Sequence, residues 1–278
     1  MYRVAVDPER GSLAGTPEPI LGGSRVVNSL GLSPDGQWLV WASGGLRENL
    51  FVIRMDGTGY RQITDDEFRN RGPQWSADGS TIGFYSNRSG RYQVWSVRPD
   101  GSGLEQLTAV TAGSAWFPEW SYDGTRVATS GAPTTRLFDP LKPRDQREVL
   151  ALPPIAEGLG FQSVSWSPDG SRLAGVGQHK DGSAAGIFLY HLQPGSYERV
   201  AVGGRNPQLL WDGRRLLYED GGSIVFLDPA TGRTATLLSL GTLVSTSNAR
   251  SFRLSRDNRW IVFSHSEAEA DIWLMSLD

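Results

Sequence analysis

Polar side chains recur at fixed distances before six aspartates that are spread evenly along the chain. The aspartates, each followed by Gly or Asn, are Asp35, Asp78, Asp123, Asp169, Asp212 and Asp257. Seven residues before them stand Asn28, Arg71, Trp116, Gln162, Arg205 and Arg250, and four residues before them stand Gly31, Gln74, Glu119, Ser165, Gln208 and Arg253. A planar guanidinium can hold a carboxylate through two parallel hydrogen bonds. If these positions converge, their arginines predict a site for an anion or a peptide.

The predicted binding site takes its members from both sets of positions. It consists of Asn28, Arg71, Trp116, Glu119, Gln162, Arg205, Arg250 and Arg253. The alternative is a polar, water-filled channel without a ligand, because a channel wall must satisfy its own polar groups in any case.

Patterns for catalysis are scarce in the sequence. The three histidines, His179, His191 and His265, fall in different parts of their repeats, so no two are expected to converge as acid–base or metal-binding groups. The chain has no cysteine, no nucleophile elbow and no phosphate-binding glycine loop before a helix. We therefore predict no catalytic residue and no metal site. A channel-sited hydrolase, lactonase or lyase is the alternative, although the acidic ring it would need is not visible.

One acidic cluster raises a separate cofactor hypothesis. Asp65, Asp66 and Glu67 lie in a charged loop and could offer oxygen ligands to Ca²⁺. Their spacing is not that of a calcium loop, and a solvated loop is the alternative interpretation. We expect no other cofactor.

The elements that must position these residues follow from the repeat itself. The intervals between the aspartates are 43, 45, 46, 43 and 45 residues. Asp-Gly supplies the positive φ of a tight turn between two strands, and each repeat continues with a third strand and a short outer strand, as at 92–97 and 105–108. Four strands per repeat predict an all-β fold, a six-bladed β-propeller of four-stranded antiparallel blades.

The last blade must be completed from the beginning of the chain, because an open ring would expose two sheet edges. Residues 16–21 (TPEPIL) predict its outer strand, which closes the ring. Residues 2–6 and 271–277 both resemble its third strand, and the sequence does not decide between them. We expect residues 1–278 to form one propeller domain. The spare strand raises the hypothesis that this domain is the C-terminal part of a longer protein.

Composition narrows the classes of partner. The net charge is −3 and the arginines are scattered among acids, which excludes the basic stripe typical of nucleic-acid binding. No apolar run approaches the roughly 20 residues of a membrane span, and the N-terminus lacks the pattern of a signal peptide. We expect a monomer with a protein or peptide partner.

The repeat at 75–108, WSADGSTIGFYSNRSGRYQVWSVRPDGSGLEQLT, resembles the units of the TolB-like propeller family, which follow a Trp-Ser-Pro-Asp-Gly pattern. The resemblance covers essentially the full chain. It implies a protein-binding propeller in the periplasm or another extracytoplasmic compartment, with the cytoplasm as the alternative. The ending at 269–278 is also similar to propeller regions that follow kinase or winged-helix domains in large bacterial proteins. The resemblance therefore implies a binding or sensory module rather than an enzyme.

Overall fold

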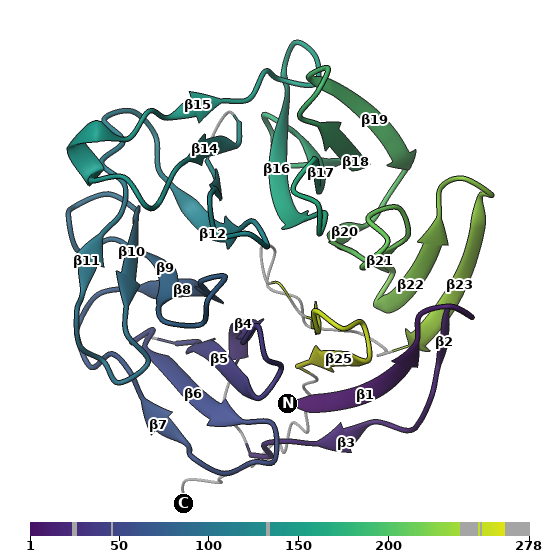
Figure 1. Ribbon diagram of the computed structural model, residues 1–278, viewed down its shortest axis with the longest axis horizontal. Coiled ribbons are helices and arrows are strands. Elements are labelled where there is room, and N and C mark those ends of the chain that lie inside the picture. Colours follow the sequence, from purple (N-terminus) through teal and green to yellow (C-terminus); the bar gives the residue numbers. More distant parts are fainter. Residues whose placement is uncertain (24–26, 46, 132–133, 240–249, 251, 265–278) are drawn as a thin grey trace, which may run out of the picture.

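The computed structural model describes residues 1–23, 27–45, 47–131, 134–239, 250 and 252–264. These residues form six antiparallel sheets, which lie around a central axis as the blades of a propeller (Figure 1). In the described part of the chain, the one helical element is the short 3₁₀ turn η1 (Arg144–Gln146). The predicted six-bladed, all-β architecture is confirmed.

The first three blades follow each other directly along the chain. Blade one contains β4 (Val27–Leu32), β5 (Trp38–Ser43), β6 (Leu50–Arg54) and β7 (Arg61–Gln62). Blade two contains β8 (Asn70–Trp75), β9 (Ile82–Ser86), β10 (Gln93–Val97) and β11 (Glu105–Gln106). Blade three contains β12 (Trp116–Trp120), β13 (Val127–Ser130), β14 (Arg136–Phe138) and β15 (Leu150–Ala151).

The remaining blades complete the circle. Blade four contains β16 (Leu159–Trp166), β17 (Arg172–His179), β18 (Ala184–His191) and β19 (Ser196–Ala201). Blade five contains β20 (Arg205–Leu209), β21 (Leu216–Asp220), β22 (Ser223–Asp228) and β23 (Arg233–Ser239). Blade six contains β24 (Phe252–Leu254), β25 (Trp260–Phe263), β1 (Tyr2–Asp7), β2 (Ser12–Leu13) and β3 (Glu18–Pro19).

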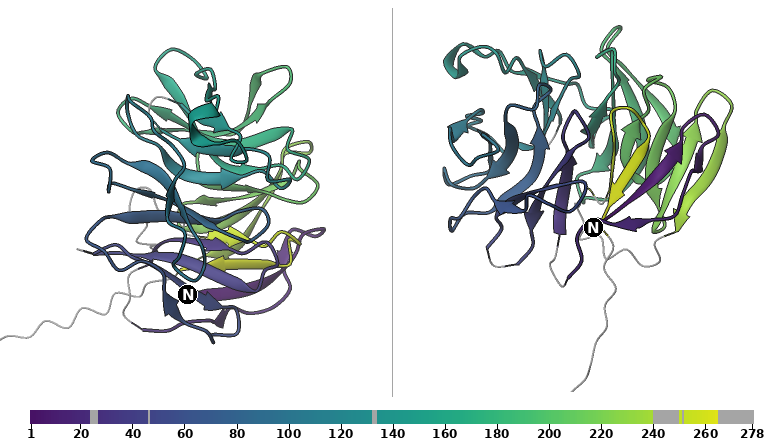
Figure 2. Two further views of the ribbon diagram at one scale, coloured as in Figure 1. Left: turned by 60° about the vertical axis from the view of Figure 1, so that its left-hand side comes forward. Right: turned by 60° about the horizontal axis from the view of Figure 1, so that its bottom comes forward.

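Blade six is closed by the N-terminal segment, as expected. β1 pairs antiparallel with β25, with Tyr2 opposite Phe263, and therefore occupies the place of the third strand. β3 pairs with β1, with Arg3 opposite Glu18, so the predicted outer strand at 16–21 forms over Glu18–Pro19. The competing candidate at 271–277 lies outside the described residues. Figure 2 shows β1 and β25 side by side at the seam of the ring.

Apolar side chains fill the wedge between neighbouring blades. Between blades one and two, Val40 and Val52 pack in one cluster with Ile82 and Phe84. Between blades two and three the Trp120 ring packs directly against the backbone of Gly83. A Cβ atom at this position would lie 2.1 Å from Cη2 of Trp120, so only glycine fits. Burial of this kind stabilises each blade by roughly 1.5–3 kcal/mol per large apolar side chain.

A serine and an aspartate fix the hairpin turn between the first two strands of a blade. In blade four, the Ser167 hydroxyl donates to Asp169 Oδ1 at 2.6 Å, and the Ser171 backbone N–H donates to the same oxygen at 3.0 Å. These donors favour the ionised carboxylate and lower the pKa of Asp169 to about 2. The Ser-x-Asp-Gly pattern of the sequence therefore supplies the hydrogen bonds that stabilise the turn.

Blade three is the irregular member of the ring. Its outer strand β15 pairs with β14 through two residue pairs, and the connection between them contains η1. Leu141 in this connection is 77% exposed, because the connection leaves the sheet instead of turning tightly, and Leu150 in β15 is 62% exposed. The wedge between blades three and four is correspondingly open.

Candidate functional site

The first strand of each blade lies nearest the central axis and lines the channel (Figure 1). We call the end of the channel where these strands begin the loop mouth. The opposite end, where the hairpin turns with the six aspartates lie, is the turn face. In Figure 2, at right, the yellow hairpin turn between β24 and β25 points upward. The residues predicted seven positions before each aspartate lie at the loop mouth.

A β-bulge interrupts the first strand at the same place in several blades. The residue six positions before the turn aspartate has a positive φ in blades two, three and five: 58° at Gly72, 47° at Phe117 and 52° at Asn206. The register of these strands shifts at the same point. A bulge bends the strand and re-aims its side chains. It thereby separates the loop-mouth residues from the channel residues that follow them.

Inside the channel, Glu119 of blade three is shared by two arginines of blade six. Arg253 Nη2 donates to Glu119 Oε1 at 2.9 Å, and Arg250 forms an ion pair with the same carboxylate. Gln74 Nε2 adds a third donor at 3.2 Å. All four side chains are buried, with Arg250 and Arg253 each 5% exposed. Predicted residues from opposite sides of the ring therefore meet and block the channel.

This buried cluster carries two guanidinium groups against one carboxylate. Burial and the neighbouring Arg253 charge lower the pKa of Arg250 well below its ordinary value, and burial lowers the pKa of Arg253 to about 9. Both shifts reflect the cost of removing a cation from water. Backbone carbonyls compensate in part: Leu30 O accepts from Arg253 and Ser163 O from Arg250, each at 3.1 Å. A further anion at this place would be stabilised by the uncompensated charge.

Arg71 is held at the loop mouth by a residue that was not predicted. Its Nη2 donates to Glu48 Oε1 at 2.5 Å, and its Nε donates to Glu48 Oε2. Glu48 belongs to blade one and is only 5% exposed, and its hydrogen bonds raise the pKa of Arg71. The guanidinium of Arg71 is therefore already paired with a carboxylate of the chain itself.

Arg205 remains the most accessible of the predicted arginines. Its Nε lies 3.2 Å from Glu219 Oε1, while its side chain is 47% exposed and that of Glu219 is 1% exposed. A cavity of about 330 Å³ opens beside this pair. Its lining includes Gln162, Gln178, Arg205, Asn206, Asp220 and Arg250. The loop mouth thus offers a cavity that reaches from an exposed arginine to a buried one.

The structure brings only part of the predicted site together. Gln162, Arg205 and Arg250 line the loop-mouth cavity, and Glu119 and Arg253 lie below them in the channel. Trp116 begins β12 opposite Ser130, and Asn28 lies at the register shift of β4. These two residues and Arg71 are not part of the cavity lining. Of the eight predicted ligand-binding residues, five therefore line the loop-mouth cavity or the channel below it.

Two acidic residues at the loop mouth, Glu219 and Glu48, are not among the predicted site residues, although the spacing of the sequence indicates the position of Glu219. Beyond the bulge, residues equally far before and after the turn aspartate face each other across the hairpin, which is why Arg205 pairs with Glu219. Counting seven residues beyond Asp212 would have found Glu219. Glu48 reaches Arg71 from the neighbouring blade, so no spacing within one repeat indicates it.

The geometry gives little support to a calcium site at Asp65, Asp66 and Glu67 or to a metal site built on the histidines. Asp66 Oδ2 accepts from Arg88 Nη2 at 2.9 Å, and Asp66 Oδ1 accepts from Asn70 Nδ2 at the same distance. His191 Nε2 lies 3.0 Å from Glu198 Oε2 at the edge of blade four, and His265 lies outside the described residues. Within the described ranges, no three His, Cys, Asp or Glu side chains gather closely enough to hold a metal ion.

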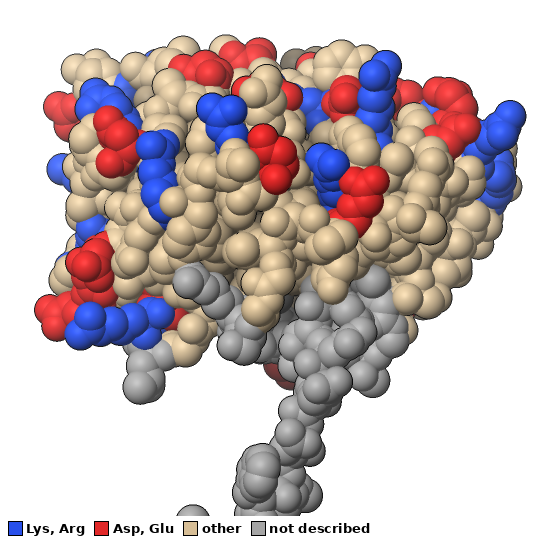
Figure 3. All heavy atoms as spheres, turned by 90° about the horizontal axis from the view of Figure 1, so that it is seen from below, with Lys and Arg blue, Asp and Glu red and all other residues tan. Residues whose placement is uncertain are grey.

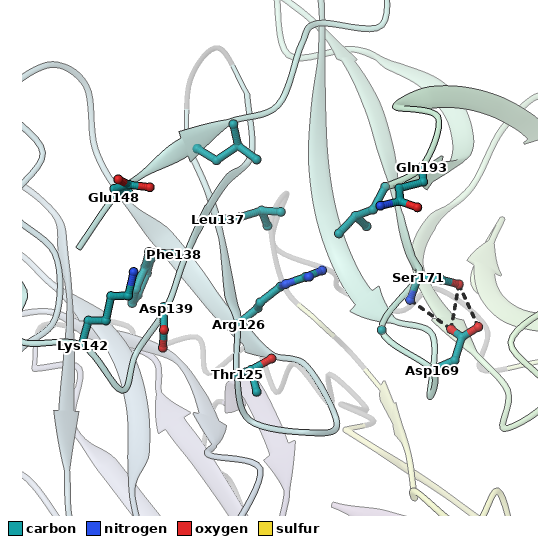
Figure 4. A pocket seen from close by; sticks show the side chains of 13 residues that line it. Thr125, Arg126, Leu137, Phe138, Asp139, Lys142, Glu148, Asp169, Ser171 and Gln193 are labelled. Atoms are coloured by element: carbon teal, nitrogen blue, oxygen red, sulfur yellow. Dashed lines mark hydrogen bonds between the residues drawn. The ribbon is translucent and has the colours of Figure 1, made fainter. Parts of the chain in front are cut away.

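A second cavity, of about 790 Å³, lies in the open wedge between blades three and four (Figure 4). Arg126 extends into it, with Asp139 and Lys142 from blade three on one side and Asp169 and Ser171 from blade four on the other. None of the predicted site residues lines it. It is a consequence of the irregular connection before β15.

Comparison with known proteins places the chain among propellers. The family described as the TolB beta propeller domain matches residues 24–137. An uncharacterized protein of Agrobacterium fabrum is 35% identical over 159 residues, which cover 52% of this chain and 53% of that protein. Dipeptidyl-peptidase 5 of Porphyromonas gingivalis is 26% identical over 345 aligned positions, which cover 98% of this chain and 50% of the peptidase. The chain thus spans about half the length of the curated relatives it matches.

A solved structure shows the same fold. The structure assigned to TolB from Agrobacterium tumefaciens superposes with a TM-score of 0.71 and 15% identity, covering 94% of this chain and 96% of that one. At this identity the likeness concerns the fold alone. The described residues include no helix long and apolar enough to cross a membrane.

Proposed function

Because the chain belongs to the TolB-like β-propellers, we propose that it is a non-catalytic binding module that takes an acidic peptide segment of a protein partner at the loop mouth. Residues 1–278 would act as one propeller domain, since blade six joins strands from near both ends of the described chain. The TolB likeness favours a compartment outside the cytoplasm for this role.

The observation that carries the proposal is the charge imbalance beneath the loop-mouth cavity. Arg250 and Arg253 share the single carboxylate of Glu119 in a buried place, where water screens little. Asp220 on the rim is exposed and therefore more strongly screened. A carboxylate entering the cavity could accept from Arg205 on the surface and approach Arg250 at depth. The similarity to a dipeptidyl-peptidase supports a peptide as the ligand.

The proposal is tested with a fluorescein-labelled peptide of alternating glutamate and proline, followed by fluorescence anisotropy. The variant Arg205→Gln/Glu219→Gln removes the exposed guanidinium without leaving Glu219 buried and unpaired. We expect this double variant to weaken binding about tenfold. The control is Arg214→Gln, because Arg214 is exposed on the turn face. Equal affinity of the wild type and the double variant would contradict the loop mouth as the binding site.

Catalysis in the channel is the competing role, and the same peptide distinguishes it. Mass spectrometry after long incubation would reveal cleavage, and elemental analysis would reveal a divalent metal ion. A binding module leaves the peptide intact. Cleavage together with a stoichiometric metal ion would replace the proposal with a hydrolase.

A further inference from the structure

The turn face carries three large side chains at one repeated position. The residue immediately before the turn aspartate is small or cyclic in three blades, where it is Pro34, Ala77 and Pro168. In blades three, five and six it is Tyr122, Trp211 and Arg256. None of these three is part of the predicted loop-mouth site. They lie at the other end of the blocked channel.

Tyr122 contacts both of the other two side chains, although the three blades are not all neighbours. The rings of Tyr122 and Trp211 meet edge to face, with centroids 5.7 Å apart. The guanidinium of Arg256 lies over the Tyr122 ring, 4.8 Å from its centroid. Trp211 is nevertheless 61% exposed, which is unusual for the largest apolar side chain. A Trp, a Tyr and an Arg in contact form the residue combination most enriched in binding hot spots.

Asn258 holds Trp211 against blade six. Its Oδ1 accepts a hydrogen bond from the backbone N–H of Trp211, and its Nδ2 donates to Ser255 O at 3.2 Å. Asn258 stands where the other five repeats have Gly, and its φ is 58°. The bond ties the blade-five turn to the blade-six turn. It thereby places Asp212 and Asp257, the residues that follow Trp211 and precede Asn258, on the same groove.

The groove is large and negatively charged. Its volume is about 830 Å³, and its lining includes Tyr122, Trp211, Arg256 and Trp260. Its acids are Glu9, Asp35, Asp212 and Asp257, against the two bases Arg215 and Arg256. Arg215 is already paired with both Asp212 and Glu9. The lining therefore carries two negative charges in excess. Figure 3 shows charged side chains of both signs over the upper half of the molecule in that view and a further group at its lower left.

Two of these carboxylates keep one oxygen for a ligand. Ser33 and the backbone N–H of Gln37 donate to Oδ1 of Asp35, and Ser255 and the backbone N–H of Arg259 donate to Oδ1 of Asp257. Among the described residues, no donor reaches Oδ2 of either aspartate. The turns therefore satisfy only half of each carboxylate.

We propose that this groove docks an extended, basic segment of a partner protein. An Arg or Lys of the segment would stack on the exposed indole of Trp211 through a cation–π contact. Neighbouring basic groups would donate to the outer oxygens of Asp35 and Asp257. Charge complementarity with the excess of acids selects a basic segment over an acidic one. Because the Arg250–Glu119–Arg253 cluster blocks the channel, this site is separate from the loop mouth and can be occupied independently.

The test uses two amidated, fluorescein-labelled peptides, one of alternating arginine and proline and one of alternating glutamate and proline. Proline keeps both peptides extended. We expect the arginine peptide to bind, and Trp211→Ala to weaken its binding about tenfold while Trp211→Phe keeps part of it. Asp35→Asn/Asp257→Asn should weaken it as well, since asparagine preserves the acceptor that the turn uses. Higher salt should weaken binding to the wild type.

Two controls separate docking from general charge effects. Asp181→Asn changes a turn aspartate with the same kind of serine bond, in the β17–β18 turn away from the groove, and should leave the affinity for the arginine peptide unchanged. Trp211→Ala should likewise leave the affinity for the glutamate peptide unchanged. The proposal is overturned if the arginine peptide binds Trp211→Ala as tightly as the wild type. It is also overturned if sedimentation shows that Trp211 instead mediates self-association of the free chain.

Discussion

The guanidinium carbon of Arg250 lies 4.5 Å from the ring centroid of Phe117, whose backbone has a φ of 47°. Phe117 also meets Tyr85 edge to face, with centroids 4.9 Å apart. A bulky side chain adopts such a backbone conformation only where its surroundings hold it there. The bulge of blade three and the buried arginine of blade six therefore depend on each other.

Replacing Phe117 should reveal the strained backbone. Phe117→Gly and Phe117→Ala both remove the ring contacts, but only glycine adopts a positive φ without a steric penalty. We expect Phe117→Gly to be more stable than Phe117→Ala by about 1 kcal/mol of unfolding free energy, measured by urea denaturation. At Thr234, an exposed position in β23, the same pair should show the opposite order. A more stable Phe117→Ala would show that the bulge relaxes.

Removing the negative charge from the channel should destabilise the fold strongly. Glu119→Gln leaves Arg250 and Arg253 buried without a carboxylate. We expect a loss of about 3–5 kcal/mol in the free energy of unfolding, because an uncompensated buried charge is costly. The control Glu157→Gln, at an exposed position, should change it by less than about 0.5 kcal/mol. A loss for Glu119→Gln as small as that of the control would mean that the two arginines need no anion.

Lowering the pH from 3.8 toward 2 should reduce the stability that the turn aspartate Asp169 contributes. The pKa of Asp169 is lowered from 3.8 to about 2 in the folded protein, chiefly because Ser167 and Ser171 donate to its carboxylate. A lowered pKa adds stability that is complete above pH 3.8 and is lost as the pH falls toward 2. The difference in unfolding free energy between the wild type and Asp169→Asn should therefore shrink over this window. A difference that stays constant from neutral pH down to pH 2 would contradict the role of these hydrogen bonds.

Loss of the N-terminal segment should open the ring. Deleting residues 1–23 removes β1, β2 and β3 and exposes the apolar surface that Val4 and Val6 bury. We expect the melting temperature to fall by more than about 10 °C, given roughly 2–5 kcal/mol for each large buried apolar side chain. Arg10→Ala, at an exposed position of the same segment, is the control. A truncated chain that melts within about a degree of the intact one would rule out closure by this segment.

The repeat made the blades predictable because its turn chemistry is local. Asp-Gly and the residues around it fix each hairpin within a dozen positions, and the pairing of Arg205 with Glu219 follows from counting outward from Asp212 once the register shift at the bulge is included. The partners of Arg250 and Arg253 could not be found in this way. Glu119 lies three blades away, so the contact depends on the width of the whole ring.

Two other features depended on contacts between blades. Asn258 could be interpreted from the sequence only as a substitute for glycine, whereas its side chain ties the blade-five turn to the blade-six turn. The choice of Tyr2–Asp7 as the third strand of blade six likewise needed the register between β1 and β25. Spacing within one repeat gives no information about the Asn258 hydrogen bond or about which segment forms the third strand of blade six.

The closing strand has a consequence for how the chain is synthesised. Tyr2 finds its partner Phe263 only after the whole stretch between them has been translated. At about 5–20 residues per second this takes on the order of ten to fifty seconds. During that time β1 can pair with β2 and β3 but lacks β25 and the apolar side chains of blades five and six that pack on Val4 and Val6, while the middle blades can already fold. A chaperone that binds β1 without folding it should therefore raise the yield of closed rings in a cell-free translation system. The effect should disappear for a chain that lacks residues 1–23 and receives them as a separate peptide.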